Sequence, residues 1–353
     1  MGIASLLVLF ATAGLSADAD LVTERVFGPE IPGKYKHPAS ITELQNGDLF
    51  LVYYGGSGEY ANDATVYSAR LRKGETKWSA PQPITPRPRL PEGNAVVWQA
   101  PDGVVWLFSV VRHGATWSTS RIVARTSTDG AHTWQEPTPL TTEDGTMVRS
   151  KPIGLPGGDY LLPIYHETGN DREQVGADTT SLFLRYEVKS KRWTESTRIR
   201  SRLGNLQPAV AWLGGNDLVC YCRRGGDYRP RTDGYVVRSE SHDGGWTWSP
   251  GKDSAFPNPN AAVDFLRLAN GHLLLVYNDS MSRRTPLTAA LSTDGDKSYP
   301  HRRNLAEGAG DFAYPFAIQT RDGKIHVIYT SQRRSVINRA VFEEAALLPR
   351  KTP

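Results

Sequence analysis

The chain has 353 residues, enough for one large or two medium domains, and a formal net charge of +4. Its basic residues are scattered rather than clustered, which argues against a nucleic-acid partner and fits a small anionic ligand better. The 33 Gly, the 24 Pro and an aromatic content of 10% favour many short strands and tight turns over helices.

The first 20 residues have the composition of an export signal. An apolar run over residues 3–15 is too short for a membrane span but suits a signal-peptide hydrophobic region, and small residues at 17 and 19 offer a cleavage site. We expect a signal peptide over residues 1–19 and one exported domain, periplasmic or extracellular, over residues 20–353. A buried N-terminal strand or a retained anchor is the alternative. No later segment is apolar for long enough to span a membrane, so we expect no membrane contact after leader removal.

One pattern recurs six times: a turn around glycine followed by an apolar strand, as in NGDLFLVYY and NGHLLLVYN. Asn-Gly or Asp-Gly between two apolar runs is a strong hairpin signal. Successive copies lie 52 to 57 residues apart, and further apolar strands precede them, as in HPASITEL and YPFAIQT. The reference glycines are Gly47, Gly103, Gly158, Gly215, Gly271 and Gly323.

A third strand follows these hairpins and enters a turn closed by an aromatic residue. Four antiparallel strands per period, repeated six times, predict an all-β fold, a six-bladed β-propeller. Only five turns of this type are visible, so we expect the N-terminal strand to join the C-terminal one in the sixth blade and close the ring. The third strands are expected at residues 64–71, 120–127, 181–188, 235–241 and 287–293.

The turns after the third strands share a pattern that is clearest in SHDGGWTW, residues 241–248. Asp243 can accept hydrogen bonds from backbone amides of its own turn, and Gly244 permits a positive φ. Trp248 can fold back between neighbouring blades. STDGAHTW, residues 127–134, is a near copy, and we interpret both turns as structural rather than catalytic.

The sequence shows no cofactor or metal signature. Its Asp and His residues are scattered without metal-ligand spacing, so we expect neither a cofactor nor a metal. The two cysteines, Cys220 and Cys222, fall on the same face of one strand, which predicts two buried thiols rather than a disulfide.

SHDGGWTW and STDGAHTW resemble the Asp-boxes, or BNR repeats, of the sialidase superfamily. The Asp-box also occurs in lyases, other glycosidases and non-enzymatic propellers, but six blades with several boxes are more specific. The match of period and blade order covers about residues 30–345. HPASITELQNGDL, LQPAV and NPNAAVDFLRLANGHLLLVYN resemble the divergent bacterial and plant sialidase-like branch.

The blade geometry predicts where side chains converge. In each blade the start of the first strand and the end of the second lie on one face of the ring, near its axis. Charged residues at those positions predict a polar, cation-rich pocket for an anionic ligand. Residues expected there include Lys36, His37, Glu59, Arg149, Lys151, Glu167, Gln207, Arg223, Asn260, Arg283, Arg284, Tyr314, Arg333 and Arg334.

The family resemblance implies a mechanism for some of these residues. In sialidases three arginines hold the sugar carboxylate, a tyrosine activated by a glutamate attacks the anomeric carbon, and a loop aspartate supplies the proton. Arg223 resembles the second arginine. Arg284 resembles the third, and Arg283 can trade places with it. Tyr314 falls where the nucleophile opens the sixth blade.

Three positions depart from the sialidase pattern. Lys36 stands where the first arginine is expected, and it keeps the charge but loses the planar two-pronged grip. The loop acid is Glu59 or Asp63, of which we choose Glu59. The activating glutamate is replaced by Gln207, which cannot act as a base, so His166 or Glu167 would have to substitute.

Three functions fit this sequence, and the first is our choice: a monomeric, exported, exo-acting glycoside hydrolase of sialidase type on a terminal anionic sugar of a glycan. The second is a uronate-glycan lyase, in which His37 or Tyr314 takes the C5 proton. The third is a carbohydrate-binding propeller without turnover. A hydrolase that pairs Glu59 with Glu167 or Asp264 is a further possibility. We assign catalysis to Tyr314, Glu59, Gln207 and His37, and substrate binding to Lys36, Arg223, Arg284, Arg283, Lys151, Glu167 and Asn260.

Overall fold

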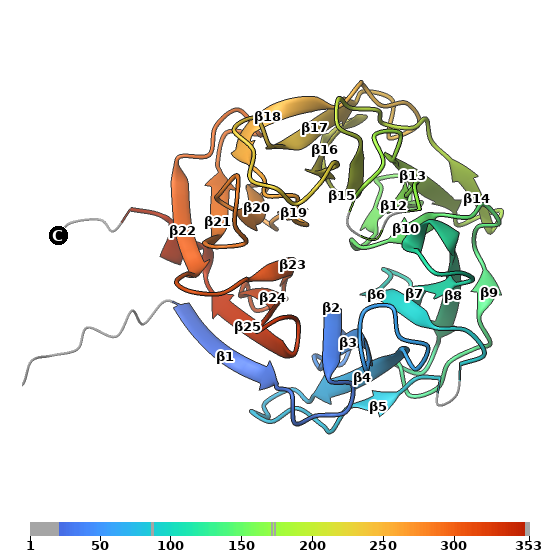
Figure 1. The fold of residues 1–353 in the computed structure, drawn as a ribbon. Helices are drawn as coiled ribbons and strands as arrows, with labels where there is room; N and C mark the ends of the chain where they lie inside the picture. Colours follow the sequence, from blue (N-terminus) through green and yellow to red (C-terminus); the bar gives the residue numbers. More distant parts are fainter. Residues whose placement is uncertain (1–20, 86–87, 171, 173, 350–353) are drawn as a thin grey trace, which may run out of the picture.

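The computed structural model describes residues 21–85, 88–170, 172 and 174–349. They form six antiparallel sheets arranged as blades around a central axis, which confirms the predicted six-bladed β-propeller (Figure 1). The helical elements of these residues are two short 3-10 turns, η1 (Trp117–Thr119) and η2 (Glu344–Leu347). No helix among them is both long enough and apolar enough to cross a membrane. The predicted signal peptide lies outside the described residues.

Each blade presents four strand positions from the axis outward, and the third blade splits its first position into two short strands. The first strands are β2 (Tyr35–Glu43), β6 (Glu92–Gln99), β10 (Thr146–Val148) with β11 (Ile153–Gly154), β15 (Asn205–Gly214), β19 (Asp264–Arg267) and β23 (Ala313–Gln319). The second strands are β3 (Leu49–Gly56), β7 (Val105–Arg112), β12 (Tyr160–His166), β16 (Asp217–Arg224), β20 (Leu273–Asn278) and β24 (Ile325–Ser331). The third strands are β4 (Thr65–Leu71), β8 (Ser120–Ser127), β13 (Thr180–Glu187), β17 (Tyr235–Ser241), β21 (Leu287–Ser292) and β25 (Val336–Phe342). The outer strands are β5 (Gln82–Pro83), β9 (Thr138–Pro139), β14 (Arg192–Glu195), β18 (Lys252–Pro257), β22 (His301–Ala306) and β1 (Leu21–Phe27).

The ring is closed by the two ends of the described chain, as the sequence predicted. Strand β1 pairs antiparallel with β25, so the first strand of the chain is the outer strand of the last blade (Figure 1). An ion pair between Arg339 and Glu24, 2.9 Å long, joins the same two strands. This pairing covers an edge that β25 would otherwise expose.

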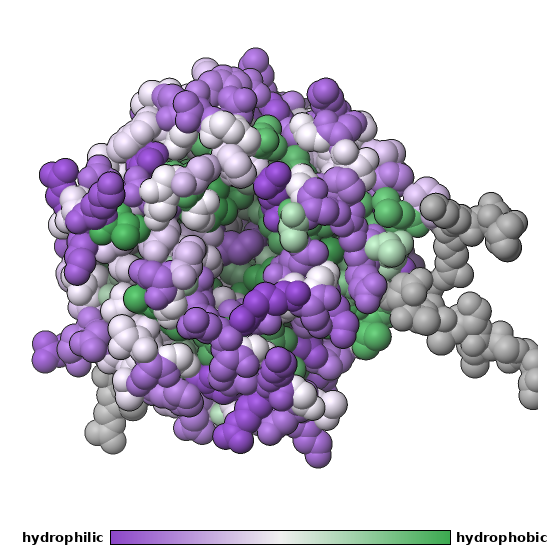
Figure 2. All heavy atoms as spheres, turned by 180° about the vertical axis from the view of Figure 1, so that it is seen from behind, coloured by the Kyte–Doolittle hydropathy of each residue, from purple (hydrophilic) through white to green (hydrophobic). Residues whose placement is uncertain are grey.

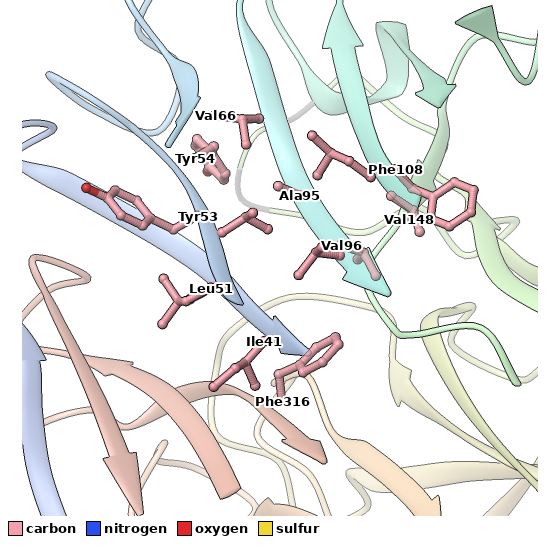
Figure 3. Close-up of a cluster of buried hydrophobic side chains, with 14 of the residues drawn as sticks. Ile41, Leu51, Tyr53, Tyr54, Val66, Ala95, Val96, Phe108, Val148 and Phe316 are labelled. Atoms are coloured by element: carbon pink, nitrogen blue, oxygen red, sulfur yellow. The ribbon is translucent and has the colours of Figure 1, made fainter. Parts of the chain in front are cut away.

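The blades are held together by apolar side chains packed between neighbouring sheets. Figure 3 shows one such cluster, in which residues of blades 1, 2, 3 and 6 meet. Ile41 and Leu51 come from blade 1, Val96 from blade 2, Val148 from blade 3 and Phe316 from blade 6, and all are fully or almost fully buried. Many strand sequences are continuous apolar runs because neighbouring blades cover both faces of each sheet.

The Asp-box turns act as the sequence predicted, as structural braces. Asp243 accepts hydrogen bonds from the backbone N–H groups of Trp246 (3.0 Å) and Thr247 (2.9 Å) and from the Ser241 hydroxyl (2.8 Å). Trp248 stacks on Phe183 of the preceding blade with ring centroids 4.2 Å apart. Each turn therefore stabilises a blade and its contact with the neighbour.

The remaining local predictions are also confirmed. All six hairpin glycines have a positive φ, from 53° at Gly215 to 93° at Gly158 and Gly271. Cys220 and Cys222 are buried free thiols with sulfur atoms 4.0 Å apart.

The ring has two faces on which side chains gather around the axis. Figure 2 shows one face, with a hollow near its centre surrounded by hydrophilic and apolar side chains. One axial cavity of about 540 Å³ is lined by the far ends of the first strands, including Trp98, Trp212 and Ile318. The other axial pocket is lined by the starts of first strands and the ends of second strands, and it contains most of the predicted site residues.

Candidate functional site

A repeated irregularity at the start of the first strands builds the pocket. In blades 1, 2, 4 and 6 the pairing register shifts within the first residues of the strand, which is the signature of a β-bulge. Asn94, Gln207 and Tyr314 lie in these shifts with φ values of 32°, 55° and 54°, and His37 occupies the corresponding place in blade 1. All four side chains line the same pocket, so the bulges direct one side chain per blade toward the axis.

The pocket is nearly closed by two loops. Its free volume is about 30 Å³, little more than the space of one water molecule. The loops that follow β12 and β16 pair with each other through Val175 and Gly226, and they place Arg172 and Tyr228 in the pocket wall. A ligand much larger than a water molecule would need these loops to move apart.

Tyr314 lies in the centre of the site. Its hydroxyl oxygen accepts hydrogen bonds from Arg223 Nη1 (2.8 Å) and Gln207 Nε2 (3.3 Å). Burial by itself raises the pKa of the Tyr314 phenol, but the charges of Arg223, Arg284 and Arg334 outweigh burial and lower it below its usual value of 10. The arginines therefore make the Tyr314 phenol more acidic than a free tyrosine.

Arg223, Arg284 and Arg334 form what we call the inner arc, one arginine from each of blades 4, 5 and 6. Arg223 uses four of its five N–H groups within the site, because it also donates to Asn260 Oδ1 (2.6 Å), Gln207 Oε1 (3.3 Å) and Tyr228 Oη (2.9 Å). The guanidinium carbon of Arg284 lies 5.6 Å from the Tyr314 ring centre and 5.7 Å from that of Tyr228.

Arg284 and Arg334 do not line the closed pocket, but they contact residues that do. Arg284 Nη2 donates to the Asn260 carbonyl (3.1 Å), and Arg334 pairs with the carboxylate of Glu59 and donates to Tyr35 Oη (3.2 Å). Tyr228 is 41% exposed and lies over both Arg223 and Arg284. Displacing the Tyr228 loop therefore uncovers two guanidinium groups at once.

Two carboxylic acids line the opposite part of the pocket. Glu59 accepts a hydrogen bond from Trp117 Nε1 (3.4 Å) in addition to its pairing with Arg334. Glu167 follows strand β12, and burial raises the pKa of its carboxyl group to about 7 although Arg223 acts to lower it. Glu167 therefore exists in both protonation states near neutral pH.

His37 is held as a neutral base. The Thr330 hydroxyl donates to the Ala313 carbonyl (3.2 Å), so its oxygen accepts the 2.7 Å hydrogen bond from His37 Nδ1–H. His37 Nε2 then carries a lone pair, and it is buried without a hydrogen-bond partner among the described residues. Burial, reinforced by four nearby arginines, lowers the pKa of His37 well below 6.5. Its ring centre lies 4.0 Å from that of Tyr314.

Gln207 occupies the place beside Tyr314 that the family resemblance gives to a glutamate. Its amide links Arg223, Tyr314 and Tyr165, whose hydroxyl oxygen also accepts a hydrogen bond from Asn94 Nδ2 (3.0 Å). Gln207 therefore orients Tyr314 but cannot take its proton.

Asn260 supports the inner arc from behind rather than facing a ligand. It is fully buried, with φ 58°, and its Nδ2 donates to the carbonyls of Gly226 (2.9 Å) and Asp227 (3.1 Å). Since its own oxygens bind Arg223 and Arg284, Asn260 fixes the two arginines relative to the Tyr228 loop.

Three residues expected at this mouth lie elsewhere. Lys36 Nζ is directed to the carbonyls of Ile31 (2.8 Å) and Gly33 (2.5 Å), because the bulge turns its side chain away from the axis. Lys151 pairs with Asp264 (2.9 Å) and lines the 540 Å³ cavity at the far ends of the first strands.

Arg283 is the third residue, and its side chain is exposed while that of its neighbour Arg284 reaches Tyr314. Arg334 takes the place in the arginine arc that we expected for Lys36. The sequence predicts Arg334 at the mouth of the pocket but gives it no role. The Lys36 N–H donates to the Arg334 carbonyl (2.8 Å), so the two segments are joined at this point.

Arg149 is a further buried cation near the axis. Its guanidinium carbon lies 5.4 Å from the Tyr314 ring centre and 5.6 Å from that of Phe316, and its Nη2 donates to the Pro315 carbonyl. The described residues contain no group of three His, Cys, Asp or Glu side chains placed to hold a metal ion.

Six blades around an axial pocket that combines arginines, a buried tyrosine and two carboxylic acids place the chain in the class of six-bladed β-propellers with a polar axial site. The family model described as the BNR repeat-like domain matches residues 47–327, more than half of the chain, and the chain belongs to that family. None of the curated proteins compared with the chain matches it.

Solved structures share the fold at low identity. The Hadza microbial sialidase Hz136 has a TM-score of 0.74 at 16% identity, over 90% of this chain and 67% of that one. A protein of unknown function from Dyadobacter fermentans has a TM-score of 0.73 at 16% identity, over 91% and 99%. The intramolecular trans-sialidase of Ruminococcus gnavus has a TM-score of 0.71 at 12% identity, over 93% and 98%. These likenesses concern the fold.

Proposed function

We propose that the protein is a glycoside hydrolase that removes a terminal acidic sugar of the sialic-acid type from a glycan. The observation that carries the proposal is the contact of Tyr314 with Arg223 inside an arginine arc that lowers the pKa of its phenol. The sialidases among the proteins of similar fold are the reason for choosing this sugar type. No cofactor takes part in the proposed reaction.

The inner arc would hold the carboxylate of the substrate. Arg223 uses four of its five N–H groups on protein acceptors, whereas Arg284 and Arg334 have more N–H groups that no described residue engages. Planar guanidinium groups bind a carboxylate through paired, charge-assisted hydrogen bonds. A carboxylate held by Arg284 and Arg334 places the adjacent anomeric carbon next to Tyr314.

The reaction would proceed in two displacements. The Tyr314 phenolate oxygen attacks the anomeric carbon, the bond to the leaving oxygen breaks with its electron pair, and Glu167 donates its proton to that oxygen. In the second step the Glu167 carboxylate takes a proton from water, whose oxygen attacks the same carbon and releases Tyr314. A carboxyl pKa of about 7 suits Glu167 to both steps. Glu59 would orient Arg334 and share the acid role.

A second function, β-elimination from a uronate-containing glycan, is favoured by His37. Its free Nε2 lone pair can take the C5 proton, the electron pair forms the C4=C5 double bond, and the C4–O bond breaks. Tyr314 would protonate the leaving oxygen, and the inner arc would neutralise the carboxylate. Gln207 replaces the glutamate that activates the tyrosine nucleophile in sialidases. This replacement supports the elimination reaction, because elimination needs no tyrosine nucleophile.

Product analysis separates the two functions. The wild-type protein would be incubated with sialylated and with uronate-bearing oligosaccharides, and the released sugars would be measured by mass spectrometry and near-ultraviolet absorbance. Hydrolysis adds one water to each cleaved bond, whereas elimination adds none and produces an absorbing unsaturated sugar. The proposal predicts a saturated acidic monosaccharide. An unsaturated product supports the lyase, and binding of these glycans without any product contradicts both.

A further inference from the structure

The arginine arc has an outer counterpart on the same three blades. The arginine doublet 223–224 ends the second strand of blade 4, and the doublets 283–284 and 333–334 lie in the loops after the second strands of blades 5 and 6. The inner arc takes one member of each doublet. Arg283 and Arg333 are the exposed members of their doublets, and in blade 4 the exposed arginine of the loop is Arg229. We call Arg229, Arg283 and Arg333 the outer arc.

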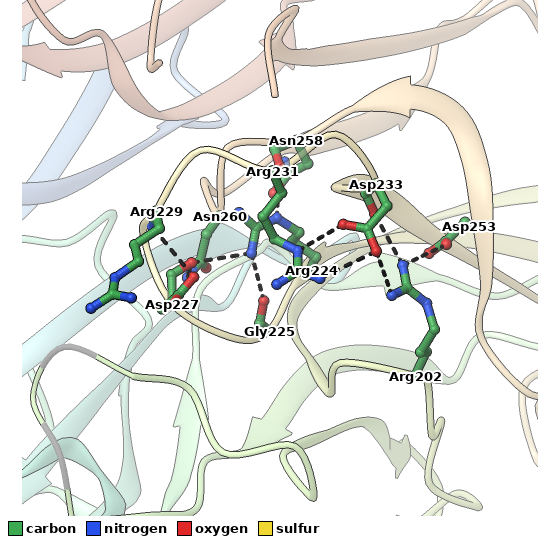
Figure 4. A network of polar contacts seen from close by, with 10 residues as sticks. All are labelled: Arg202, Arg224, Gly225, Asp227, Arg229, Arg231, Asp233, Asp253, Asn258 and Asn260. Carbon is green, nitrogen blue, oxygen red and sulfur yellow. Dashed lines mark hydrogen bonds and ion pairs between the residues drawn. The ribbon is translucent and has the colours of Figure 1, made fainter. Parts of the chain in front are cut away.

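Hydrogen bonds from Arg224 hold the base of the loop that carries Arg229. Arg224 is buried and donates to the carbonyls of Asn258 (2.8 Å), Gly225 (2.8 Å) and Asp227 (3.1 Å). Figure 4 shows this network together with a second one around Asp233, and the guanidinium of Arg229 points away from both.

Asp233 is the centre of that second network and pairs with Arg202 (2.8 Å) and Arg231 (2.9 Å). Arg202 also pairs with Asp253 (3.0 Å), so two carboxylates neutralise these two arginines within the protein. Arg229, on the same loop, is exposed and follows Tyr228, the residue that covers the inner arc.

The turn that carries Arg333 holds an unusual backbone. Gln332, Arg333 and Arg334 have φ values of 50°, 53° and 65°, a left-handed conformation that is unfavourable for residues with side chains. This conformation directs Arg334 to Glu59 while Arg333 stays exposed. A simple connection between β24 and β25 would not need three such residues in a row.

None of the ion pairs among the described residues involves an outer-arc arginine. Two nearby acids are engaged elsewhere, because Asp279 pairs with Arg302 (3.6 Å) and Asp233 pairs as described above. A third, Asp227, accepts the backbone N–H of Arg229 (3.3 Å) and forms no ion pair with its guanidinium. Each outer-arc arginine is exposed, and each follows or precedes in sequence a residue that lies at the pocket or in the inner arc. A solvent-exposed guanidinium can bind a carboxylate or sulfate group with the same paired hydrogen-bond geometry as a buried one. The interaction is weaker because water screens it.

We propose that the outer arc binds a second anionic group of the substrate, so that the substrate is a polyanionic glycan chain rather than a glycan with one acidic end. The inner arc holds the carboxylate of the terminal sugar, and the outer arc holds the carboxylate or sulfate of the sugar next to it. This inference rests on the proposed function, because it needs the terminal acidic sugar to bind at the inner arc.

The test measures binding in a Tyr314→Phe background, where turnover does not interfere. The probes are the methyl glycoside of sialic acid and a sialic acid trimer, and galacturonic acid and its trimer, each titrated by calorimetry at low and high salt. We expect the trimer of the recognised sugar to bind more tightly than the monomer, and the double variant R283Q/R333Q to weaken trimer binding roughly tenfold without affecting the monomer. The charge-keeping variant R283K/R333K should lose only part of this preference.

The matched control is Arg192→Gln, which removes an exposed arginine from the outer strand β14 and should leave both affinities unchanged. Equal binding of monomer and trimer, or a trimer affinity that R283Q/R333Q does not change, overturns the outer-arc proposal while the proposed function stands. If no monomer binds, the proposed function fails and this inference fails with it.

Discussion

The inner arc and the two pocket acids come from different halves of the ring. Blades 4, 5 and 6 supply Arg223, Arg284 and Arg334 at the ends of their second strands or in the loops that follow, whereas blades 1 and 3 supply Glu59 and Glu167 from the loops after theirs. The scaffold fixes where these loops lie, and single residues decide the charge. One repeated fold can therefore bring opposite charges to one site from different blades.

The polarity has opposite effects on the titrating groups of the two halves. On the arginine half, three cations lower the pKa of the Tyr314 phenol despite its burial. On the acid half, burial raises the pKa of Glu167 to about 7. The surroundings thus make the tyrosine more acidic and the glutamate less acidic than the free side chains, which is the direction that the proposed nucleophile and general acid require.

The largest effect is expected from Tyr314→Phe. Removing the hydroxyl takes away the group held by Arg223 and Gln207, and we expect kcat to fall by roughly 10⁴-fold with little change in KM, because the inner arc still binds the carboxylate. Steady-state kinetics with an acidic aryl glycoside would measure this. Tyr329→Phe removes a hydroxyl from strand β24 in the same blade and should keep full activity. Comparable losses in both variants would mean that Tyr314 acts only through the fold.

A smaller effect is expected from Glu167→Gln, which removes the proposed general acid. We expect kcat to fall by roughly 10² to 10³-fold and the alkaline limb of the wild-type profile to disappear. In the wild type, activity should decline as the pH rises through about 7, because the carboxyl group then loses the proton that it donates.

Protein stability gives an independent reading of the same group. A carboxyl whose pKa rises from 4.5 to about 7 on folding stabilises the fold most below pH 4.5, and that contribution is lost as the pH rises through 7. Glu167→Gln should therefore unfold at the same or a higher temperature than the wild type at pH 8. A clearly lower melting temperature, or an unchanged alkaline limb, would refute the assigned pKa. Glu187→Gln on strand β13 is the control.

His37→Gln sharpens the choice between the two proposed reactions. In hydrolysis His37 only packs against Tyr314, and we expect a loss of about tenfold or less. In elimination it is the base, and the loss should exceed about 10²-fold. The control His326→Gln alters a second buried histidine, whose pKa burial lowers to about 4, outside the pocket. A large, selective loss in His37→Gln with a saturated product would contradict both assignments of this residue.

The smallest effect on activity is expected far from the pocket, at an Asp-box. Asp243→Ala removes the acceptor for four donor groups of its turn, and we expect the free energy of unfolding to fall by about 1–3 kcal/mol while kcat and KM stay unchanged. Chemical denaturation and kinetics at a temperature below the transition would measure the two quantities. A catalytic defect in the folded variant would show that these turns do more than brace the blades.

The fold could be predicted from the sequence because its signals are local and repeated. Glycine turns such as Gly47 and Gly271 take the positive φ that their hairpins require, and the Asp-box residues bond within their own turns. Because only five of the turns that follow third strands are visible, the sequence predicts that the N-terminal strand completes the sixth blade. The pairing of β1 with β25 confirms this prediction. The turns depend on residues that are close together in the chain, and such short patterns can be recognised in a sequence.

The site could be predicted only in part, because the bulges are not visible as a pattern. Sequence position brought Tyr314, Arg223 and Arg284 to one mouth, where the structure also places them. It did not show that the shift after Lys36 turns that side chain toward the Ile31 carbonyl.

Arg334 illustrates the same limit from the other side. It reaches Glu59 only through a left-handed turn between two strands, and no residue of Gln332 to Arg334 is a glycine that would announce such a turn. The selection of Arg284 rather than Arg283 as the inward member of its doublet likewise follows from the packing of three side chains from different blades, which no local pattern encodes.

The most direct test of the central claim is covalent trapping of the pocket tyrosine. The protein would be incubated with a fluorinated acidic sugar that carries a good leaving group and slows the second displacement, and then digested for peptide mass spectrometry. The account predicts one added glycosyl group, located on Tyr314 and absent after mutation of Arg284 to Gln. A modified Glu59 or Glu167 with an unmodified Tyr314, in a protein that turns the sugar over, would contradict it.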